Sequence, residues 1–151
     1  AVNRVPMELG ELLSQCNAEY AERLAAANLE LVTDCPAGLQ VLADGRLLWR
    51  VFDNLLGNAC KYSQPGTRVY ITVEAAQEQV LVQVKNISRE VLNVTPEALM
   101  ERFVRGDSSR SAEGSGLGLS IAKSLMELNE GKLELAIDGD LFKALLTLGK
   151  P

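Results

Sequence analysis

Residues 44–62 read Asp-Gly-Arg-Leu-Leu-Trp-Arg-Val-Phe-Asp-Asn-Leu-Leu-Gly-Asn-Ala-Cys-Lys-Tyr, with the period of an amphipathic helix. Asp44 suits the N-cap position of that helix. The polar residues Asn54, Asn58 and Lys61 fall within roughly 60° of one another at one edge of the apolar half. At ~100° per residue, that apolar half holds Leu47, Leu48, Val51, Phe52, Leu55, Leu56 and Ala59. The sequence therefore predicts a helix with two amides and an ammonium in a strip beside the core.

This polar strip has two interpretations. Solvated side chains ordinarily border the buried face of a helix, and that interpretation needs no ligand. The alternative is a site for a metal ion and phosphate, because an amide oxygen is a neutral, hard ligand that suits Mg²⁺ and leaves room for water and phosphate oxygens. In that case the Lys61 ammonium meets the phosphates as a point charge.

A glycine-rich segment, residues 113–120 (Glu-Gly-Ser-Gly-Leu-Gly-Leu-Ser), passes from a polar loop into a predicted helix. Glycines let the backbone approach a ligand closely, and a helix N-terminus offers free N–H groups and a positive dipole end. These are features of a phosphate cradle, although a hinge at a helix start has the same composition. The segment is not a P-loop, because no Gly-Lys-Ser/Thr follows, and it is not a dinucleotide fingerprint, because no strand precedes it.

Just before these glycines, residues 105–110 read Arg-Gly-Asp-Ser-Ser-Arg and carry no hydrophobic period. Taken alone, the run is typical of a surface loop. Beside a phosphate cradle it becomes a candidate lid, with Arg105 and Arg110 able to reach phosphate.

The rest of the chain alternates helices with pairs of strands. Two antiparallel hairpins are predicted, 69–73 with 80–84 and 132–137 with 141–148. Hairpins mixed with helices indicate an α+β fold, a two-layer sandwich in which helices cover one face of a mixed, mostly antiparallel β-sheet. The other predicted elements are strands at 29–33 and 39–42 and helices at 7–27 (Pro6 in the first turn), 96–103 (Thr95 as N-cap) and 116–130 (Gly131 as the stop).

Length and composition limit the classes of function. The 151 residues predict one domain, 1–151, with no visible leader and no apolar run long enough to span a membrane. Lys and Arg number 15 against 20 Asp and Glu, a net charge of −5 that disfavours nucleic acid as a partner. Three cysteines without CxxC spacing are typical of free thiols in a reducing compartment. The chain contains 0 histidines, which excludes Ser-His-Asp and Cys-His catalysis and leaves no imidazole to accept a phosphoryl group.

In order and spacing these motifs resemble those of the ATP-binding catalytic domain of bacterial sensor histidine kinases. Residues 54–62, Asn-Leu-Leu-Gly-Asn-Ala-Cys-Lys-Tyr, resemble that family's N box. Residues 101–110 resemble its F box and the start of its lid, and residues 114–123 resemble its G2 box. The resemblance covers essentially the whole chain and implies the Bergerat ATP-binding fold, which gyrase-type and chaperone ATPases share.

The resemblance also implies roles for particular residues. Asn58 is expected to bind Mg²⁺, Lys61 to contact phosphate, and Tyr62 to form a wall near the adenine or ribose. Asn54 stands where gyrase-type relatives carry a glutamate that activates water, and an amide cannot accept that proton at neutral pH. The site should therefore hold ATP without hydrolysing it quickly. The expected phosphate and lid contacts are Arg105, Arg110, Gly114, Gly116, Leu117 and Gly118.

One motif of the family is altered. After the second strand of the first hairpin, where Asp-x-Gly-x-Gly is usual, the chain reads Asn86-Ile-Ser88. Asn86 falls at the position of the adenine-reading aspartate, and Ser88 at that of the first glycine. This departure bears on nucleotide affinity and on adenine selectivity.

As a whole, the resemblance implies the ATP-binding part of a two-component sensor kinase that presents Mg-ATP to a histidine on a separate helical hairpin. That hairpin would precede residues 1–28, and the phosphoryl group would pass on to a response regulator. The full-length protein is expected to be a homodimer in the plasma membrane, with this domain in the cytoplasm. Two alternatives remain: a serine kinase of the anti-sigma-factor type, and a pseudokinase whose nucleotide site serves as a binding module.

Overall fold

The computed structural model describes the backbone of residues 1–105 and 117–151, and the side chains of residues 1–100 and 118–151. Strands and helices alternate as the hairpin pattern predicts, with one additional strand at the start. In chain order the elements are β1 (Val5–Glu8), α1 (Leu9–Ala26), β2 (Glu30–Asp34), β3 (Gln40–Ala43), α2 (Gly45–Tyr62), β4 (Arg68–Ala75), β5 (Gln79–Ile87), α3 (Pro96–Arg105), α4 (Leu117–Leu128), β6 (Lys132–Asp138) and β7 (Leu141–Gly149).

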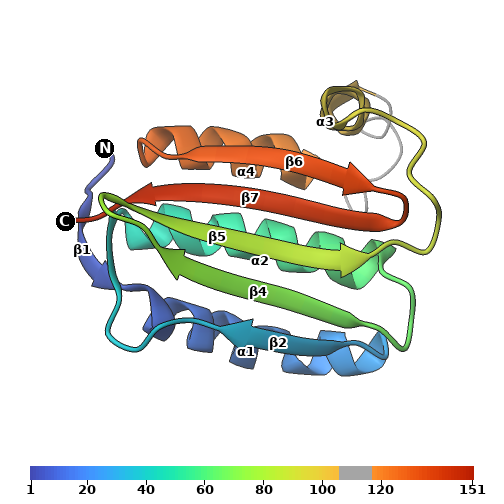
Figure 1. Cartoon of the computed structure of the whole chain (residues 1–151), viewed down its shortest axis with the longest axis horizontal. Coiled ribbons are helices and arrows are strands. Elements are labelled where there is room, and N and C mark those ends of the chain that lie inside the picture. The colour runs from blue at the N-terminus through green and yellow to red at the C-terminus, as the bar shows by residue number, and fades with distance from the viewer. Residues whose placement is uncertain (106–116) are drawn as a thin grey trace.

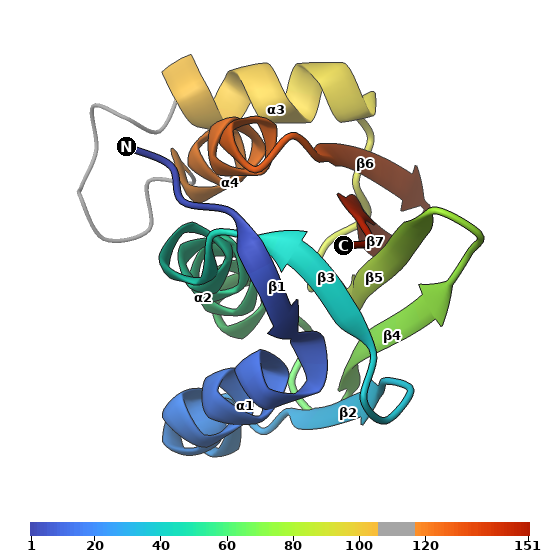
Figure 2. The same cartoon turned by 90° about the vertical axis from the view of Figure 1, so that its left-hand side faces the viewer.

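A single mixed sheet forms one layer of the molecule. Its strands run in the order β1-β3-β7-β5-β4-β2, and β6 pairs with β7. The β2–β4 pair is parallel and the other named pairs are antiparallel. Helices α1, α2 and α4 lie behind the sheet in Figure 1 and to one side of it in Figure 2. The predicted α+β sandwich with helices on one face is confirmed.

The core lies between these two layers. Buried valines and isoleucine alternate with more exposed residues along β4 and β5, as half-buried strands require. From α2 the buried side chains are Leu48, Val51, Phe52, Leu55, Leu56 and Ala59, the face that the helical period predicts. Asp44 caps this helix: its carboxylate accepts hydrogen bonds from the backbone N–H groups of Arg46 (3.1 Å) and Leu47 (3.4 Å). Both boundaries of α2 match the prediction.

The first strand corrects the sequence interpretation. Pro6 was predicted in the first turn of a helix, but it lies in β1, where it pairs in register with Leu42 of β3. Strand β1 is at the end of the sheet order, and a proline without an N–H is tolerated on such an edge strand. Helix α1 begins after it, at Leu9.

The C-terminus of α4 also differs from its prediction. The residue with positive φ is Glu130 (58°), not Gly131. The N–H of Glu130 bonds to the carbonyl of Glu127 (2.9 Å), and that of Gly131 bonds to the carbonyl of Met126 (2.8 Å), which together form a Schellman motif. A Cβ on Gly131 would lie only 2.4 Å from the carbonyl oxygen of Thr147 on β7. Gly131 is therefore needed for close packing rather than for its φ angle.

Helix α1 is joined to α2 by a buried tyrosine. The Tyr20 hydroxyl lies 2.5 Å from Oδ1 of Asp53, to which it donates, and 2.7 Å from the main-chain oxygen of the same residue. The Arg23 guanidinium stacks 4.7 Å from the centre of the Tyr20 ring.

Within the described residues, no helix is long and apolar enough to cross a membrane.

The hydrogen bond between Tyr20 and Asp53 predicts a pH-dependent contribution to the stability of the fold. Burial first, and then the hydrogen bond to Asp53, raise the pKa of the Tyr20 phenol above its ordinary value of 10.0. Because the folded state favours the neutral phenol, its contribution is complete below pH 10.0 and is lost as the pH rises toward the raised pKa. Tyr20→Phe should cost about 1.5–3 kcal/mol at neutral pH. Urea unfolding should show this difference shrinking at alkaline pH, and a constant difference would contradict the assignment.

Candidate functional site

The predicted polar strip is present on α2. Asn54, Asn58 and Lys61 are half-buried, beside the fully buried face of the helix. Helix α4 packs against α2, as both cartoon views show. A Cβ built on Gly118, in the first turn of α4, would meet the Asn54 side chain at 3.4 Å from Cβ and 3.7 Å from Oδ1. The start of the glycine-rich helix thus lies directly against Asn54 of the strip, although the two positions are 64 apart in residue number.

A second group of predicted residues meets where α2 ends. The backbone N–H of Gln64 donates to the carbonyl of Ile87 (2.7 Å), and that of Arg89 donates to the carbonyl of Tyr62 (2.9 Å). The Arg89 guanidinium also donates to the carbonyl of Lys61. These bonds fix the C-terminal end of α2 against the end of β5, so Lys61, Tyr62 and Asn86 belong to one region.

Asn86 is buried in this junction, with 5% of its surface exposed. Its side-chain Nδ2 donates to the hydroxyl of Ser63 at 2.8 Å. Ser63 itself is buried and forms an isolated β-bridge with Ser88. Since the amide NH₂ is engaged by Ser63, the amide oxygen of Asn86 is the group available to accept a hydrogen bond from a ligand.

The sequence interpretation missed two residues of this junction. Ser63 follows the N-box pattern directly, but no motif includes it. Arg89 belongs to no predicted element or motif, yet it bonds to two carbonyls of α2. Periodicity carries no signal for either contact, because both join segments more than twenty residues apart.

Several predicted contacts cannot be placed with their side chains. Arg110, Gly114 and Gly116 lie outside the described residues. Arg105 ends α3 and Leu117 begins α4, and at these two positions the backbone alone is described. The roles of these residues therefore remain predictions from sequence.

Thr95 does cap α3, since its hydroxyl accepts a hydrogen bond from the N–H of Ala98 at 3.0 Å.

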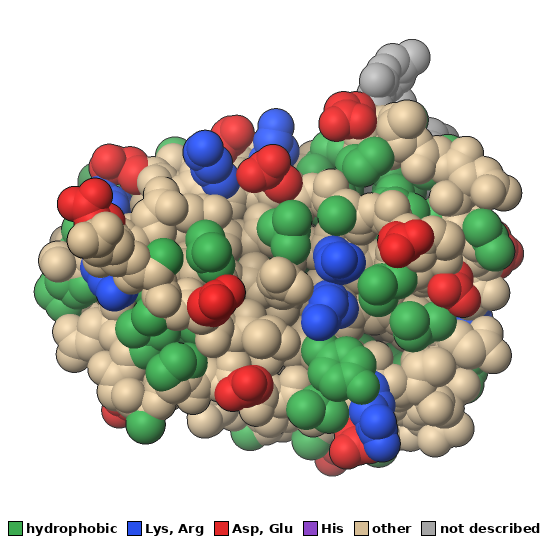
Figure 3. Space-filling model, viewed as in Figure 1, with side chains coloured by type: hydrophobic (Ala, Val, Ile, Leu, Met, Phe, Trp, Pro, Cys, Tyr) green, Lys and Arg blue, Asp and Glu red, His purple; other side chains and the backbone are tan. Residues whose placement is uncertain are grey.

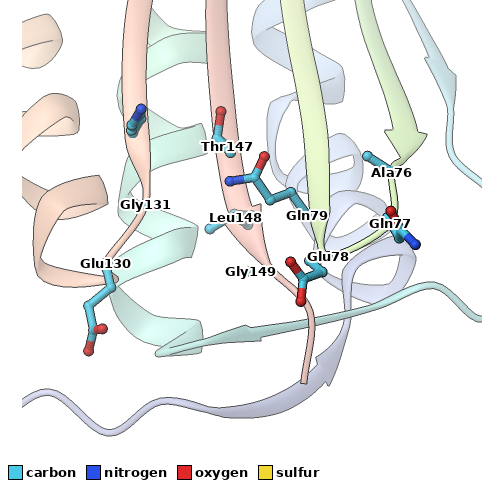
Figure 4. A pocket seen from close by; sticks show the side chains of 10 residues that line it. Ala76, Gln77, Glu78, Gln79, Glu130, Gly131, Thr147, Leu148 and Gly149 are labelled. Carbon is cyan, nitrogen blue, oxygen red and sulfur yellow. The ribbon is translucent and has the colours of Figure 1, made fainter.

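Two pockets lined by described residues lie away from these contacts. One of about 740 Å³ opens between the β4–β5 turn, the start of β6 and the end of β7, at the end of the sheet away from Asn86 (Figure 4). Its lining includes the carboxylates of Glu78 and Glu130, which would repel phosphate. Another, of about 1050 Å³, lies between the first turns of α1 and α2. Neither pocket includes a predicted nucleotide contact.

The donor set on the strip fits a metal ion and phosphate. The half-buried amides of Asn54 and Asn58 provide neutral, hard oxygen ligands of the kind that Mg²⁺ accepts. Lys61 adds a positive charge one helical turn from Asn58. The N-terminus of α4 faces the same strip, and its partial positive charge favours an anion there.

Proteins with similar sequences include kinases and sensor proteins. Signal transduction histidine-protein kinase BaeS of Escherichia coli strain K12 is 30% identical over 135 residues, which are 88% of this chain and 29% of BaeS. Probable sensor protein PcoS of Escherichia coli is 40% identical over 134 residues, which are 87% of this chain and 28% of PcoS. The chain thus spans less than a third of the length of either relative.

Solved structures share the fold. The catalytic domain of histidine kinase ThkA, in a nucleotide-free form, superposes with a TM-score of 0.81 at 24% identity, covering 98% of this chain and 96% of that one. ThkA in complex with response regulator protein TrrA superposes with a TM-score of 0.78 at 22% identity, covering 99% of this chain and 42% of that one. Residues 43–147 match the family model described as "Histidine kinase-, DNA gyrase B-, and HSP90-like ATPase". The chain belongs to this family of histidine kinase-, DNA gyrase B- and HSP90-like ATPases.

Proposed function

We propose that this chain is the ATP-binding kinase domain of a two-component sensor histidine kinase. The observation that carries the proposal is the contact of Gly118 with Asn54, which sets the start of the glycine-rich helix against the amide strip of α2. Phosphates lying beside the strip at the start of α4 would meet the N-terminal N–H groups of α4 and the ammonium of Lys61. Two relatives support this reading: BaeS is named a signal transduction histidine-protein kinase, and PcoS is named a probable sensor protein.

Within that function, the residues of the strip hold the metal and the nucleotide. Asn58 would bind Mg²⁺ through its amide oxygen, and Lys61 would contact phosphate. When bound, Mg²⁺ would neutralise phosphate charge. Asn54 contributes no general base, because an amide does not take up a proton at neutral pH. The domain thus positions ATP and screens its charge, and it leaves proton transfer to the domain that carries the acceptor.

The acceptor must lie outside this chain, which contains 0 histidines. We place it on a helical hairpin that precedes residues 1–28 in the full-length protein, with residues 1–151 as one domain. A response regulator is the onward acceptor; ThkA, a structural neighbour, forms such a complex with TrrA. We further propose that the full-length protein is a homodimer anchored in the plasma membrane, with this domain in the cytoplasm.

Label transfer from γ-labelled ATP tests the proposal. Mixed with the histidine-bearing hairpin, the chain should place acid-labile, alkali-stable label on the hairpin and none on itself. A hairpin whose acceptor histidine is replaced by glutamine is the control and should stay unlabelled. Acid-labile label on the isolated chain, or acid-stable label on a serine of a partner, would contradict a histidine kinase, and the second result would favour the serine-kinase alternative.

The Asn86–Ser63 bond leads to a prediction about purine selectivity. Because Ser63 holds the amide NH₂, the Asn86 oxygen can accept from the adenine amino group. Ser63→Ala frees the amide to turn its NH₂ toward guanine O6, so the preference for ADP over GDP should fall. The fall should be roughly 5- to 150-fold for a buried mismatch of about 1–3 kcal/mol. Asn86→Asp, which only accepts hydrogen bonds, should show the larger preference for ADP.

Dissociation constants of ADP and GDP measure this preference directly. Gln83→Glu is the matched control, because it makes the same amide-to-carboxylate change on the opposite face of β5. It should leave the ratio unchanged. If both Asn86→Asp and Ser63→Ala also leave the ratio unchanged, Asn86 does not contact the base.

A further inference from the structure

The face of the sheet opposite the helices is uncovered by the described residues. Helices α1, α2 and α4 all pack on the other face (Figures 1 and 2), and Figure 3 looks onto the uncovered one. Along β4, β5 and β7, buried residues alternate with more exposed ones. Every second residue of these strands therefore belongs to this outer face.

Two lysines stand directly opposite each other on this face. Lys85 of β5 pairs in register with Lys143 of β7, and Tyr70 of β4 lies on the other side of Lys85. Like charges at directly opposed positions destabilise a sheet. The Lys85 ammonium lies 5.5 Å from the centre of the Tyr70 ring, which offsets part of that cost. Neither lysine forms an ion pair with any residue whose side chain is described.

Apolar side chains flank the lysine pair along the strands. Ile87 pairs in register with Leu141 on one side, and Leu145 lies two residues beyond Lys143 on the other. All three are only half-buried, as are the two lysines. Figure 3 shows basic side chains together near the middle of this face, with hydrophobic side chains beside them. Exposed apolar side chains mark interaction sites, and a pair of basic side chains among them favours a partner with complementary negative charge.

Acidic residues lie nearer the margins of the same face. Glu134 of β6 pairs with Leu145, Asp138 with Leu141, and Glu74 of β4 with Leu81. An extended polyanion, such as nucleic acid or a surface of anionic lipid, would meet these carboxylates, and it would find fewer basic residues than such ligands require. A second copy placed face to face would set lysines against lysines. A single carboxylate flanked by apolar groups matches the charge pattern.

We propose that this outer face, centred on Lys85 and Lys143, is a docking surface for an acidic segment of another protein. One carboxylate of that segment lies between the two ammonium groups, and apolar side chains two residues to either side of it cover Leu141 and Leu145. This function is separate from nucleotide binding, since both lysines project from the face opposite Asn86.

The spacing of the face defines a probe. In an extended peptide, side chains two residues apart point the same way. A capped peptide Ser-Leu-Ser-Glu-Ser-Leu-Ser therefore presents one carboxylate between two leucines. Titrated into the isotope-labelled chain, it should shift the amide NMR signals around positions 85 and 143. Matched peptides with Gln or Lys in place of Glu should bind roughly four- to twentyfold more weakly or not at all, because they lose both ion pairs.

Variants of the chain locate the site. Lys85→Gln and Lys143→Gln should each weaken binding of the Glu peptide by about two- to fivefold, and added salt should weaken it further. Lys132→Gln, at an exposed position on β6, is the matched control and should change little. Mg-ATP affinity should be the same in Lys143→Gln as in the native chain. The peptide titration therefore tests the docking surface independently of the proposed function.

Other outcomes would overturn the proposal. Equal affinity for the Glu and Gln peptides, shifts confined to the edge strands β1 and β2, or no shifts at millimolar peptide would each contradict it. Two further probes distinguish other occupants: phosphatidylglycerol vesicles and a single-stranded oligonucleotide. Lysine-dependent binding to either one that exceeds binding of the peptide would also contradict it, as would a dimer of the chain, detected by sedimentation, that Lys143→Gln dissociates.

Discussion

Asn58→Ala is expected to abolish the Mg²⁺ dependence of ATP binding while leaving the fold intact. Asn58 is half-buried at the edge of the apolar face of α2, so truncating its amide removes a metal ligand without opening the core. Loss of an outer-shell partner alone typically costs about 10- to 100-fold in metal affinity, and loss of a direct ligand should cost at least as much. ATP titrations at several Mg²⁺ concentrations measure the effect.

A matched variant separates this effect from a general change in helix stability. Asn17→Ala removes the same amide from an exposed position on α1, and it should retain the native Mg²⁺ dependence. Both variants should unfold near the native temperature. If Asn58→Ala still binds ATP with unchanged Mg²⁺ dependence, Asn58 is not the metal ligand and the site on α2 is assigned wrongly.

Gly131→Ala is expected to destabilise the whole domain. The new methyl would lie 2.4 Å from the carbonyl oxygen of Thr147 and 3.0 Å from the Met126 side chain, and the backbone oxygen cannot move without disturbing the start of the β6–β7 ladder. Overpacking of this kind costs about 1–3 kcal/mol. For a domain of this size, that corresponds to roughly 2–12 °C in the unfolding temperature.

Gly10→Ala, at a glycine within helix α1, is expected to stabilise the domain instead. A Cβ on Gly10 would meet nothing within 4 Å, and alanine loses less backbone entropy than glycine on folding. This variant should be more stable than the native chain by up to about 1 kcal/mol. Calorimetric unfolding of the two variants under one condition gives the comparison. If Gly131→Ala were as stable as Gly10→Ala, the close packing of Gly131 against the Thr147 carbonyl oxygen would not restrict the side chain at position 131.

The fold could be predicted where local signals are strong. Helix α2 has a clear period and a capping aspartate, and both of its ends match the prediction. Strand β1 was missed because it has 4 residues, contains a proline, and takes its stability from pairing with β3, which is distant in sequence. Glu130 was missed as the left-handed residue at the end of α4 because glycine is the usual choice there and Gly131 stands next to it.

The candidate site also has a part that the sequence predicts and a part that it does not. The amide strip follows from helical geometry, so sequence alone places Asn54, Asn58 and Lys61 together. The contacts that join the strip to the other parts of the candidate site are long-range. Gly118 reaches Asn54 only because α4 packs on α2, and Asn86 reaches Ser63 only because the end of β5 lies beside the end of α2. No periodic pattern encodes such pairs, and resemblance to a family was needed to connect the segments.

Isothermal titration of the native chain with ATP, with and without Mg²⁺, tests the central claim most directly. The account predicts one nucleotide site per chain, tighter binding when Mg²⁺ is present, and little phosphate release while the complex persists, because Asn54 does not act as a base. An absence of binding at millimolar Mg-ATP would contradict a kinase domain and would favour a module whose nucleotide site no longer takes ATP.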